Sequence, residues 1–193
     1  MNSRRLFLLC VLSFVTGCNV QTGVAPTEAV ITDCSDRDFG FVGTWIPSPD
    51  PHFPDDISTF EMSIERDGSY TAILVDAARK NSDQLAANFR THEISKEHPH
   101  AIVEIELKNN ERIVYRRLAI AAVEDDRLYL WMIDGRKIGE HLFDDGVTAV
   151  IEHFTFSTTV RCDSTQLLES LSKHSGDIVG GAQVFRRKPN AGR

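Results

Sequence analysis

The chain has 193 residues, 41% hydrophobic and 25% charged, a composition typical of one globular domain with a real core. Acidic residues outnumber basic ones by 28 to 21, which gives a formal net charge of −7. This balance excludes nucleic acid and anionic lipid as electrostatic partners, because both require clustered positive charge.

The N-terminal segment, residues 1–17, has the three parts of a secretory signal. Arg4-Arg5 supplies the positive start, Leu6–Val15 is apolar, and the small pair Thr16-Gly17 precedes Cys18. A membrane anchor that stays in place is the alternative interpretation. However, the apolar stretch is well short of the roughly 20 residues that a spanning helix needs. The segment therefore predicts export from the cytoplasm.

Val15-Thr16-Gly17-Cys18 resembles the lipobox of bacterial lipoproteins. The resemblance implies that Cys18 becomes the lipid-modified N-terminus of the mature protein and carries several acyl chains in an envelope membrane. Asn19 follows the cysteine. In enteric bacteria an aspartate at this position favours retention in the inner membrane. The expected location is therefore the outer membrane, facing the periplasm.

Two cysteines, Cys34 and Cys162, remain after the signal is removed with Cys10 and Cys18 is lipidated. An even pair in an oxidising compartment predicts a disulfide. Two buried free thiols, or half of a metal site, are the alternatives.

The segment before the first strand is polar and predicts a flexible tether. Residues 19–33 contain few large apolar side chains, and we assign 18–38 to the lipid-anchored tether. The folded domain is expected over 39–188, and residues 189–193 form a disordered tail.

From Phe39 onward, apolar and polar residues alternate with a period of two, as in half-buried strands. Tight turns are expected at Asp67-Gly68, Asn109-Asn110 and Asp125-Asp126. The predicted strands are Phe60–Glu65, Tyr70–Val75, Ala101–Lys108, Arg112–Val123, Leu128–Ile133, Val147–Val160 and Gln183–Arg187.

Two segments interrupt this pattern. Pro47–Asp56 contains four prolines in ten residues and predicts an irregular loop. Ala77–Pro99 is polar and mixed. It fits a short helix near residues 83–88, a strand near 89–94, or mostly loop, and the sequence does not decide between them.

After Cys162 the period becomes helical, from a cap at Asp163 or Ser164 to Gly176, with an apolar face of Leu167, Leu168 and Leu171. Strands joined by short turns, then one helix and a last strand, predict a mainly β fold. We expect an antiparallel up-and-down barrel or a strongly curved sheet.

Gly43-Thr44-Trp45, followed by a strand meander, one helix and a last strand, resembles the lipocalin-like (calycin) architecture. In that family a Gly-x-Trp motif on the first strand lies at the closed end of the barrel. The resemblance implies that Trp45 packs against an arginine near the end of the chain, which matches Arg186 or Arg187. A tryptophan that simply fills the core behind a glycine is the alternative.

No catalytic constellation is recognisable in the sequence. It contains no Gly-x-Ser-x-Gly nucleophile motif and no glycine-rich phosphate loop. His92-Glu93 begins like a zinc-protease helix, but Lys96 occupies the position of the second ligand. We therefore expect no enzymatic activity and no cofactor.

The best metal candidates are His92, His98 and His100, with glutamates nearby in sequence. A solvated polar loop that leads into a strand explains the same residues without a metal. A pocket for a small apolar ligand is the other candidate site, although a filled core explains its aromatic residues equally well. Its expected lining is Tyr115, Tyr129, Leu130, Trp131, Phe154 and Phe156.

These observations predict a membrane-anchored, non-enzymatic envelope lipoprotein that acts as an interaction or structural module. Its expected partners are the membrane, through the lipid on Cys18, and an envelope protein. A lipocalin-like carrier of a small apolar ligand such as a lipid or fatty acid is the alternative, and a metal sensor built on the three histidines is a third hypothesis.

Overall fold

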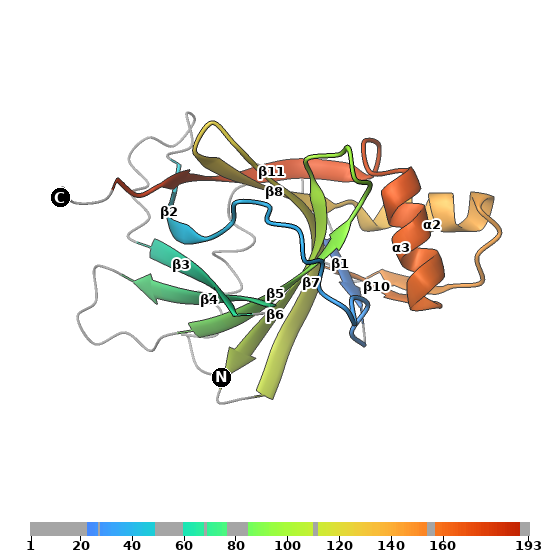
Figure 1. Ribbon diagram of the computed structural model, residues 1–193. Coiled ribbons are helices and arrows are strands. Elements are labelled where there is room, and N and C mark those ends of the chain that lie inside the picture. Colours follow the sequence, from blue (N-terminus) through green and yellow to red (C-terminus); the bar gives the residue numbers. More distant parts are fainter. Residues whose placement is uncertain are drawn as a thin grey trace.

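A computed structural model describes residues 23–26, 28–48, 60–67, 69–76, 85–109, 112–153 and 157–189 (Figure 1). No helix in these ranges is long and apolar enough to cross a membrane. The elements, in chain order, are β1 (Gly23–Pro26), β2 (Gly43–Pro47), β3 (Phe60–Asp67), β4 (Ser69–Asp76), β5 (Leu85–Glu93), β6 (Ala101–Asn109), β7 (Arg112–Glu124), β8 (Arg127–Ile133), α2 (Gly135–Asp144), β9 (Val150–His153), β10 (Ser157–Arg161), α3 (Ser164–Lys173) and β11 (Val179–Arg187).

Eight antiparallel strands close into a barrel in the order β11-β2-β3-β4-β5-β6-β7-β8. The expected fold class, a lipocalin-like up-and-down barrel, is confirmed. The predicted turn at Asp125-Asp126 joins β7 to β8, and both residues have positive φ, 48° and 57°. This backbone matches the right-handed twist of the flanking strands, and aspartate tolerates it better than most residues.

The predicted C-terminal helix is α3, which directly precedes the last barrel strand. The Asp163 carboxylate accepts a hydrogen bond from the Gln166 backbone N–H at 3.0 Å, so Asp163 is the N-cap. Leu167 and Leu171 are buried as the apolar face requires.

A second helix, α2, was not predicted. Asp134 caps it by accepting from the Arg136 and Lys137 amides, Ile138 and Leu142 form its buried face, and Gly146 follows with φ of 72°. A capping aspartate, an apolar i, i+4 pair and a glycine with positive φ after the last turn are helix signals that the sequence carries over only ten residues.

The prediction of one long strand over Val147–Val160 is wrong. This region forms two short strands, β9 and β10, which lie outside the barrel. They belong to a separate sheet of order β1-β10-β9, in which β1 runs parallel to β10. β-propensity marked the region as extended, but the partner of an extended segment is a long-range property.

The prediction of a flexible tether over 18–38 is wrong from Gly23 onward. β1 belongs to the outer sheet, and Val30 and Ile31 are buried, 6% and 1% exposed. We call residues 28–38 the strap, because they run from β1 across the outer face of the barrel to its closed end. A polar composition predicts low intrinsic order, yet the contacts of the strap with distant strands hold it in place.

The undecided segment contains strand β5, which pairs with both β4 and β6. A helix is therefore absent from its described part, which begins at Leu85. Most of the proline-rich loop lies outside the described residues. Asn110, the second residue of the turn expected at Asn109-Asn110, and residues 190–193 of the expected tail also lie outside them.

The predicted disulfide is also wrong, since Cys34 and Cys162 are both free and half-buried. Cys34 Sγ lies 3.2 Å from the Thr91 hydroxyl oxygen at the end of β5. Cys162 packs into a different core, between β10 and α3, where burial raises the pKa of its thiol. The two thiols thus have separate environments.

Two hydrophobic cores follow from this architecture. One lies inside the barrel, and the other lies between the outer face of β6–β8 and the layer of β1, α2 and α3, seen to the right of the barrel in Figure 1. Part of the outer face of β6–β8 is therefore apolar, like the inner face. Their outward side chains in the second core are Ile102, Leu118, Ile120 and Ile133.

Candidate functional site

The closed end of the barrel is built around Trp45, which is completely buried. The guanidinium of Arg187 lies over the indole at 4.4 Å and donates to the carbonyls of Val42 and Gly40 at 2.8 and 3.2 Å. The Trp45 indole N–H donates to the Phe41 carbonyl at 2.8 Å. The expected stacking of arginine on tryptophan is confirmed.

Arg187, and not Arg186, makes this contact because Arg187 pairs directly with Trp45 across β11 and β2. Directly opposed residues share a face, and Arg186 points to the other one. Gly43 completes the arrangement, since a Cβ there would lie 2.5 Å from the Arg187 guanidinium. Its φ of 144° is also strained for other residues.

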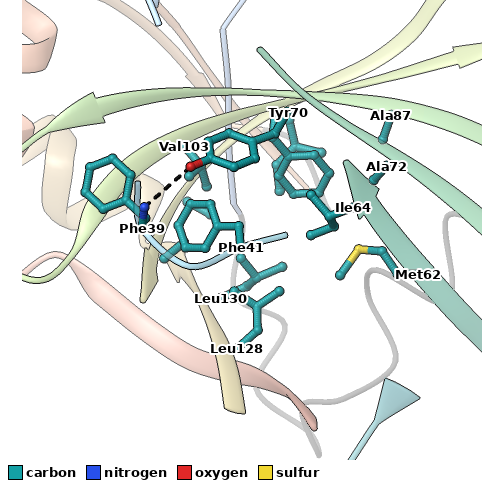
Figure 2. Packing of buried hydrophobic residues seen from close by; sticks show 14 of the residues in the cluster. Phe39, Phe41, Met62, Ile64, Tyr70, Ala72, Ala87, Val103, Leu128 and Leu130 are labelled. Carbon is teal, nitrogen blue, oxygen red and sulfur yellow. Dashed lines mark hydrogen bonds between the residues drawn. The ribbon is translucent and has the colours of Figure 1, made fainter. Parts of the chain in front are cut away.

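Three aromatic rings fill the interior beside this closure (Figure 2). The rings of Phe39 and Phe41 stack at 5.6 Å, and Phe41 lies 5.4 Å from the ring of Tyr70. The Tyr70 hydroxyl accepts from the Phe39 amide at 3.4 Å, the dashed line in Figure 2, and burial raises its pKa. The chain that follows the strap therefore plugs this end of the barrel.

Two polar side chains face the interior farther from the plug. Arg117 is paired with the inward Ile105, and Gln183 with the inward Leu130, so the register places both on the inner face. They are 7% and 9% exposed. A guanidinium in an apolar barrel is chemically suited to a carboxylate or another anion.

The predicted ligand pocket does not form as a set. Leu130 faces the barrel interior, but Tyr129 and Trp131 alternate with it and lie on the outer face, where their rings stack at 5.3 Å. Side chains one position apart on a strand point to opposite faces, so these three side chains cannot line one cavity together. Tyr115 lies in β7, paired with Leu107. The side chain of Tyr115 and all of Phe154 and Phe156 lie outside the described residues.

The three histidines proposed as metal ligands are only partly brought together. The rings of His98 and His100 meet edge to face at 4.6 Å, and His100 lies 3.4 Å from the Glu124 carboxylate. His92 lies on β5, and burial lowers its pKa and that of His98. Within the described part of the chain, no three His, Cys, Asp or Glu side chains are arranged to hold a metal ion.

A buried ion network, which the sequence did not reveal, holds the strap on the barrel. Glu104 is 0% exposed and accepts from the amides of Val30 and Ile31 at 3.1 and 2.8 Å. Arg116 lies 3.0 Å from Glu104 and 2.7 Å from the equally buried Glu106. The alternation in β6 predicts a solvent-facing glutamate at both positions. The strap instead covers Glu104, and Arg116 and Arg90 lie against Glu106.

The region between α2 and α3 also contains a polar cluster, centred on two stacked histidines. The rings of His141 and His174 lie 3.9 Å apart and nearly parallel. Each bonds a carboxylate at 3.1 Å, His141 to Asp177 and His174 to Asp145. Asp145 also accepts from Ser170 at 2.8 Å and pairs with Lys173.

The Asp145 contacts predict a pH dependence of stability. Hydrogen bonds from Lys173 and Ser170 lower the pKa of Asp145 from 3.8 to about 2. Its contribution to stability is therefore present above pH 3.8 and lost as the pH falls through about 2. We expect Asp145→Asn to lower the thermal midpoint at neutral pH and to converge on the parent protein between pH 4 and 2, measured by circular dichroism. The exposed Asp33→Asn serves as control, and a constant difference across this range would contradict the prediction.

A groove lies on the surface between α2 and β9, with a volume of about 540 Å³. Helix α2 approaches the outer sheet closely because Gly135 lies against Thr158 and Gly139 against Ile151. Phe143, at the end of α2, is 83% exposed. The residues that line this α2–β9 groove are Arg136, Gly139, Glu140, Phe143, Asp144, Ile151 and His153.

The described residues thus contain a plugged, mainly apolar barrel with an inward arginine, a strap held by buried charges, and a groove on the outer layer. Comparison of the chain with protein-family models, with curated proteins and with solved structures finds no match in any of the three.

Proposed function

We propose that this chain is a non-enzymatic, lipid-anchored protein of the bacterial cell envelope, whose barrel is a scaffold for interactions at its outer surface. The outer membrane, facing the periplasm, is its proposed location. The observation that carries the proposal is that the chain enters the folded domain at Gly23, five positions after the lipobox cysteine Cys18.

Three contacts tie this N-terminal region to the domain. β1 pairs with β10, the strap bonds Glu104, and Phe39 with Phe41 fills the closed end of the barrel. A lipid on Cys18 would therefore lie only five positions from a residue that is held in the fold. This arrangement suits a protein that must stay at a membrane surface in a defined orientation.

The test is the variant Cys18→Ser, expressed with its own signal in a bacterium that lipidates such proteins. We expect the parent protein to incorporate labelled palmitate and to sediment with membranes, and the variant to do neither while keeping its thermal midpoint. The midpoint should not change because the described contacts begin at Gly23. Cys34→Ser is the matched control and should retain the label. Labelling of the Cys18 variant, or its continued sedimentation, would contradict the proposal.

A second candidate function, a carrier of an amphipathic acid such as a fatty acid, is favoured by Arg117 on the inner face of the barrel. A buried guanidinium would hold the carboxylate while the apolar interior received the chain. We expect the Cys18→Ser protein to bind a fluorescent fatty acid, and Arg117→Met to weaken binding by about 10- to 100-fold. Arg186→Met, an exposed position, is the control. Equal binding by both variants, with unchanged thermal midpoints, would exclude this role.

A further inference from the structure

We infer that the domain docks on the surface of the membrane through the α2–β9 groove, with Phe143 inserted among the lipids, and that the preferred surface is zwitterionic. The inference rests on the proposed lipid attachment at Cys18. It names the membrane, through one specific face of the domain, as the partner of that anchored protein.

The first argument is the length of chain between the lipid and the fold. Five positions separate Cys18 from Gly23, and even a fully extended chain spans only about 18 Å over that length. A lipid on Cys18 would thus hold the start of β1 close to the bilayer. The anchored domain has few orientations available, and all of them keep the β1 side near the membrane.

The second argument is the position of the groove relative to that attachment point. Gly23 pairs with Ser157, and the next residue of β10, Thr158, pairs with His153 at the end of β9. Two strand spacings, about 10 Å, therefore separate the start of β1 from the groove residue His153. Figure 1 shows β1 and β10 beside the two helices, on one side of the barrel.

The third argument is the exposure of an apolar side chain in the groove. Phe143 is 83% exposed, more than any other large hydrophobic residue in the described part of the chain. A phenylalanine exposed at a helix end is suited to anchor a protein at a membrane interface, because moving its ring from water into lipid is favourable.

The fourth argument is charge, which selects the lipid. Two carboxylates, Glu140 and Asp144, line the groove together with Phe143. Arg136 is the one arginine or lysine among the residues that line this groove. Anionic headgroups would repel these carboxylates within a Debye length of about 10 Å. Phosphatidylethanolamine or phosphatidylcholine carries no net charge and allows the phenylalanine to insert.

The experiment places a fluorescent reporter at Phe143 in the full lipidated protein. Phe143→Trp is reconstituted into phosphatidylcholine vesicles whose acyl chains are brominated, a short-range quencher of tryptophan. The matched control is Ile73→Trp. Ile73 is 38% exposed on β4, which lies four strands from β8 around the barrel and so faces away from the outer sheet. Two native tryptophans contribute to the signal, Trp45, which is fully buried, and Trp131, which is partly buried on the outer face of β8. The parent protein, which contains both, therefore sets the background.

We expect quenching of the tryptophan at position 143 and none above background at position 73. Replacing a quarter of the lipid by phosphatidylglycerol should reduce the quenching, and the added variant Glu140→Gln should restore part of it. In sedimentation with ordinary phosphatidylcholine vesicles, Phe143→Ser in the Cys18→Ser background should lower the partition coefficient about tenfold or more.

Each alternative gives a different result. If the protein's own acyl chain, or a second copy of the domain, covers the groove, brominated bilayer lipid does not quench position 143, and the inference is overturned. Equal quenching at both positions would also overturn it. Intact mass spectrometry of the reconstituted protein separates the two proposals: a lipidated but unquenched protein refutes the docking face alone, whereas a protein without lipid refutes the proposed anchoring.

Discussion

Replacing Glu104 by alanine should lower the free energy of unfolding by about 3–5 kcal/mol, the usual cost of removing one partner from a buried charge network. After the change, Arg116 keeps its ion pair with Glu106 but loses the one with Glu104. The amides of Val30 and Ile31 lose their hydrogen-bond acceptor. Denaturation in guanidinium chloride, followed by circular dichroism, measures the loss.

Glu104→Gln separates the charge from the hydrogen bonds. Burial raises the pKa of Glu104, against the opposing effects of the Ile31 amide and Arg116. The neutral form is therefore less costly at this position than at the surface, and glutamine, which keeps one acceptor oxygen, should cost only about 1–3 kcal/mol.

Glu152→Ala is the control for the Glu104 variants. Glu152 pairs with Arg161 at 2.9 Å, but both side chains are about half exposed, so the loss should stay below about 1 kcal/mol. If Glu104→Ala were as mild as this control, Glu104 would not hold the strap on the barrel. A large loss accompanied by faster tryptic cleavage after Arg37 would locate the damage in the strap.

Gly135→Ala should destabilise the protein by about 2 kcal/mol, within the range for overpacking a tight contact. A Cβ at this position would lie 2.3 Å from both Cβ and Oγ1 of Thr158, so helix α2 must move away from β10. The higher helix propensity of alanine offsets at most about 1 kcal/mol of this cost. Thermal and denaturant unfolding measure the effect.

Gly176→Ala is the matched control, because a Cβ at that glycine meets no heavy atom within 4 Å and its φ is not positive. Its stability should stay within about 0.5 kcal/mol of the parent protein. Equal effects of the two substitutions would mean that the close approach of α2 to the outer sheet does not depend on Gly135.

Local patterns in the sequence predicted the elements that local physics controls. Alternation along β3 and β6 marks strands, because successive side chains point to opposite faces. The turn at Asp125-Asp126 follows from the tolerance of aspartate for positive φ, and α3 follows from its cap at Asp163. These signals depend on a few neighbouring residues, so they can be recognised in a single sequence.

Several of the wrong predictions share one cause, which is that a neighbour far away in sequence decided the outcome. Glu104 looks like a surface residue until the strap, 73 and 74 residues earlier, covers it. β1 looks like tether until β10 supplies a partner strand. The predicted pocket is wrong for a local reason instead, because Tyr129 and Trp131 alternate with the inward Leu130 along β8.

For the candidate sites, the sequence by itself determined the residue types: a glycine and tryptophan on the first barrel strand, with an arginine near the end of the chain. Only the tertiary structure decided that Arg187 is the stacked arginine, that Arg117 faces the interior, and that Phe143 is left exposed beside β9. The physical reason is that period two fixes which residues share a face, whereas strand register and the covering layers fix what each face meets.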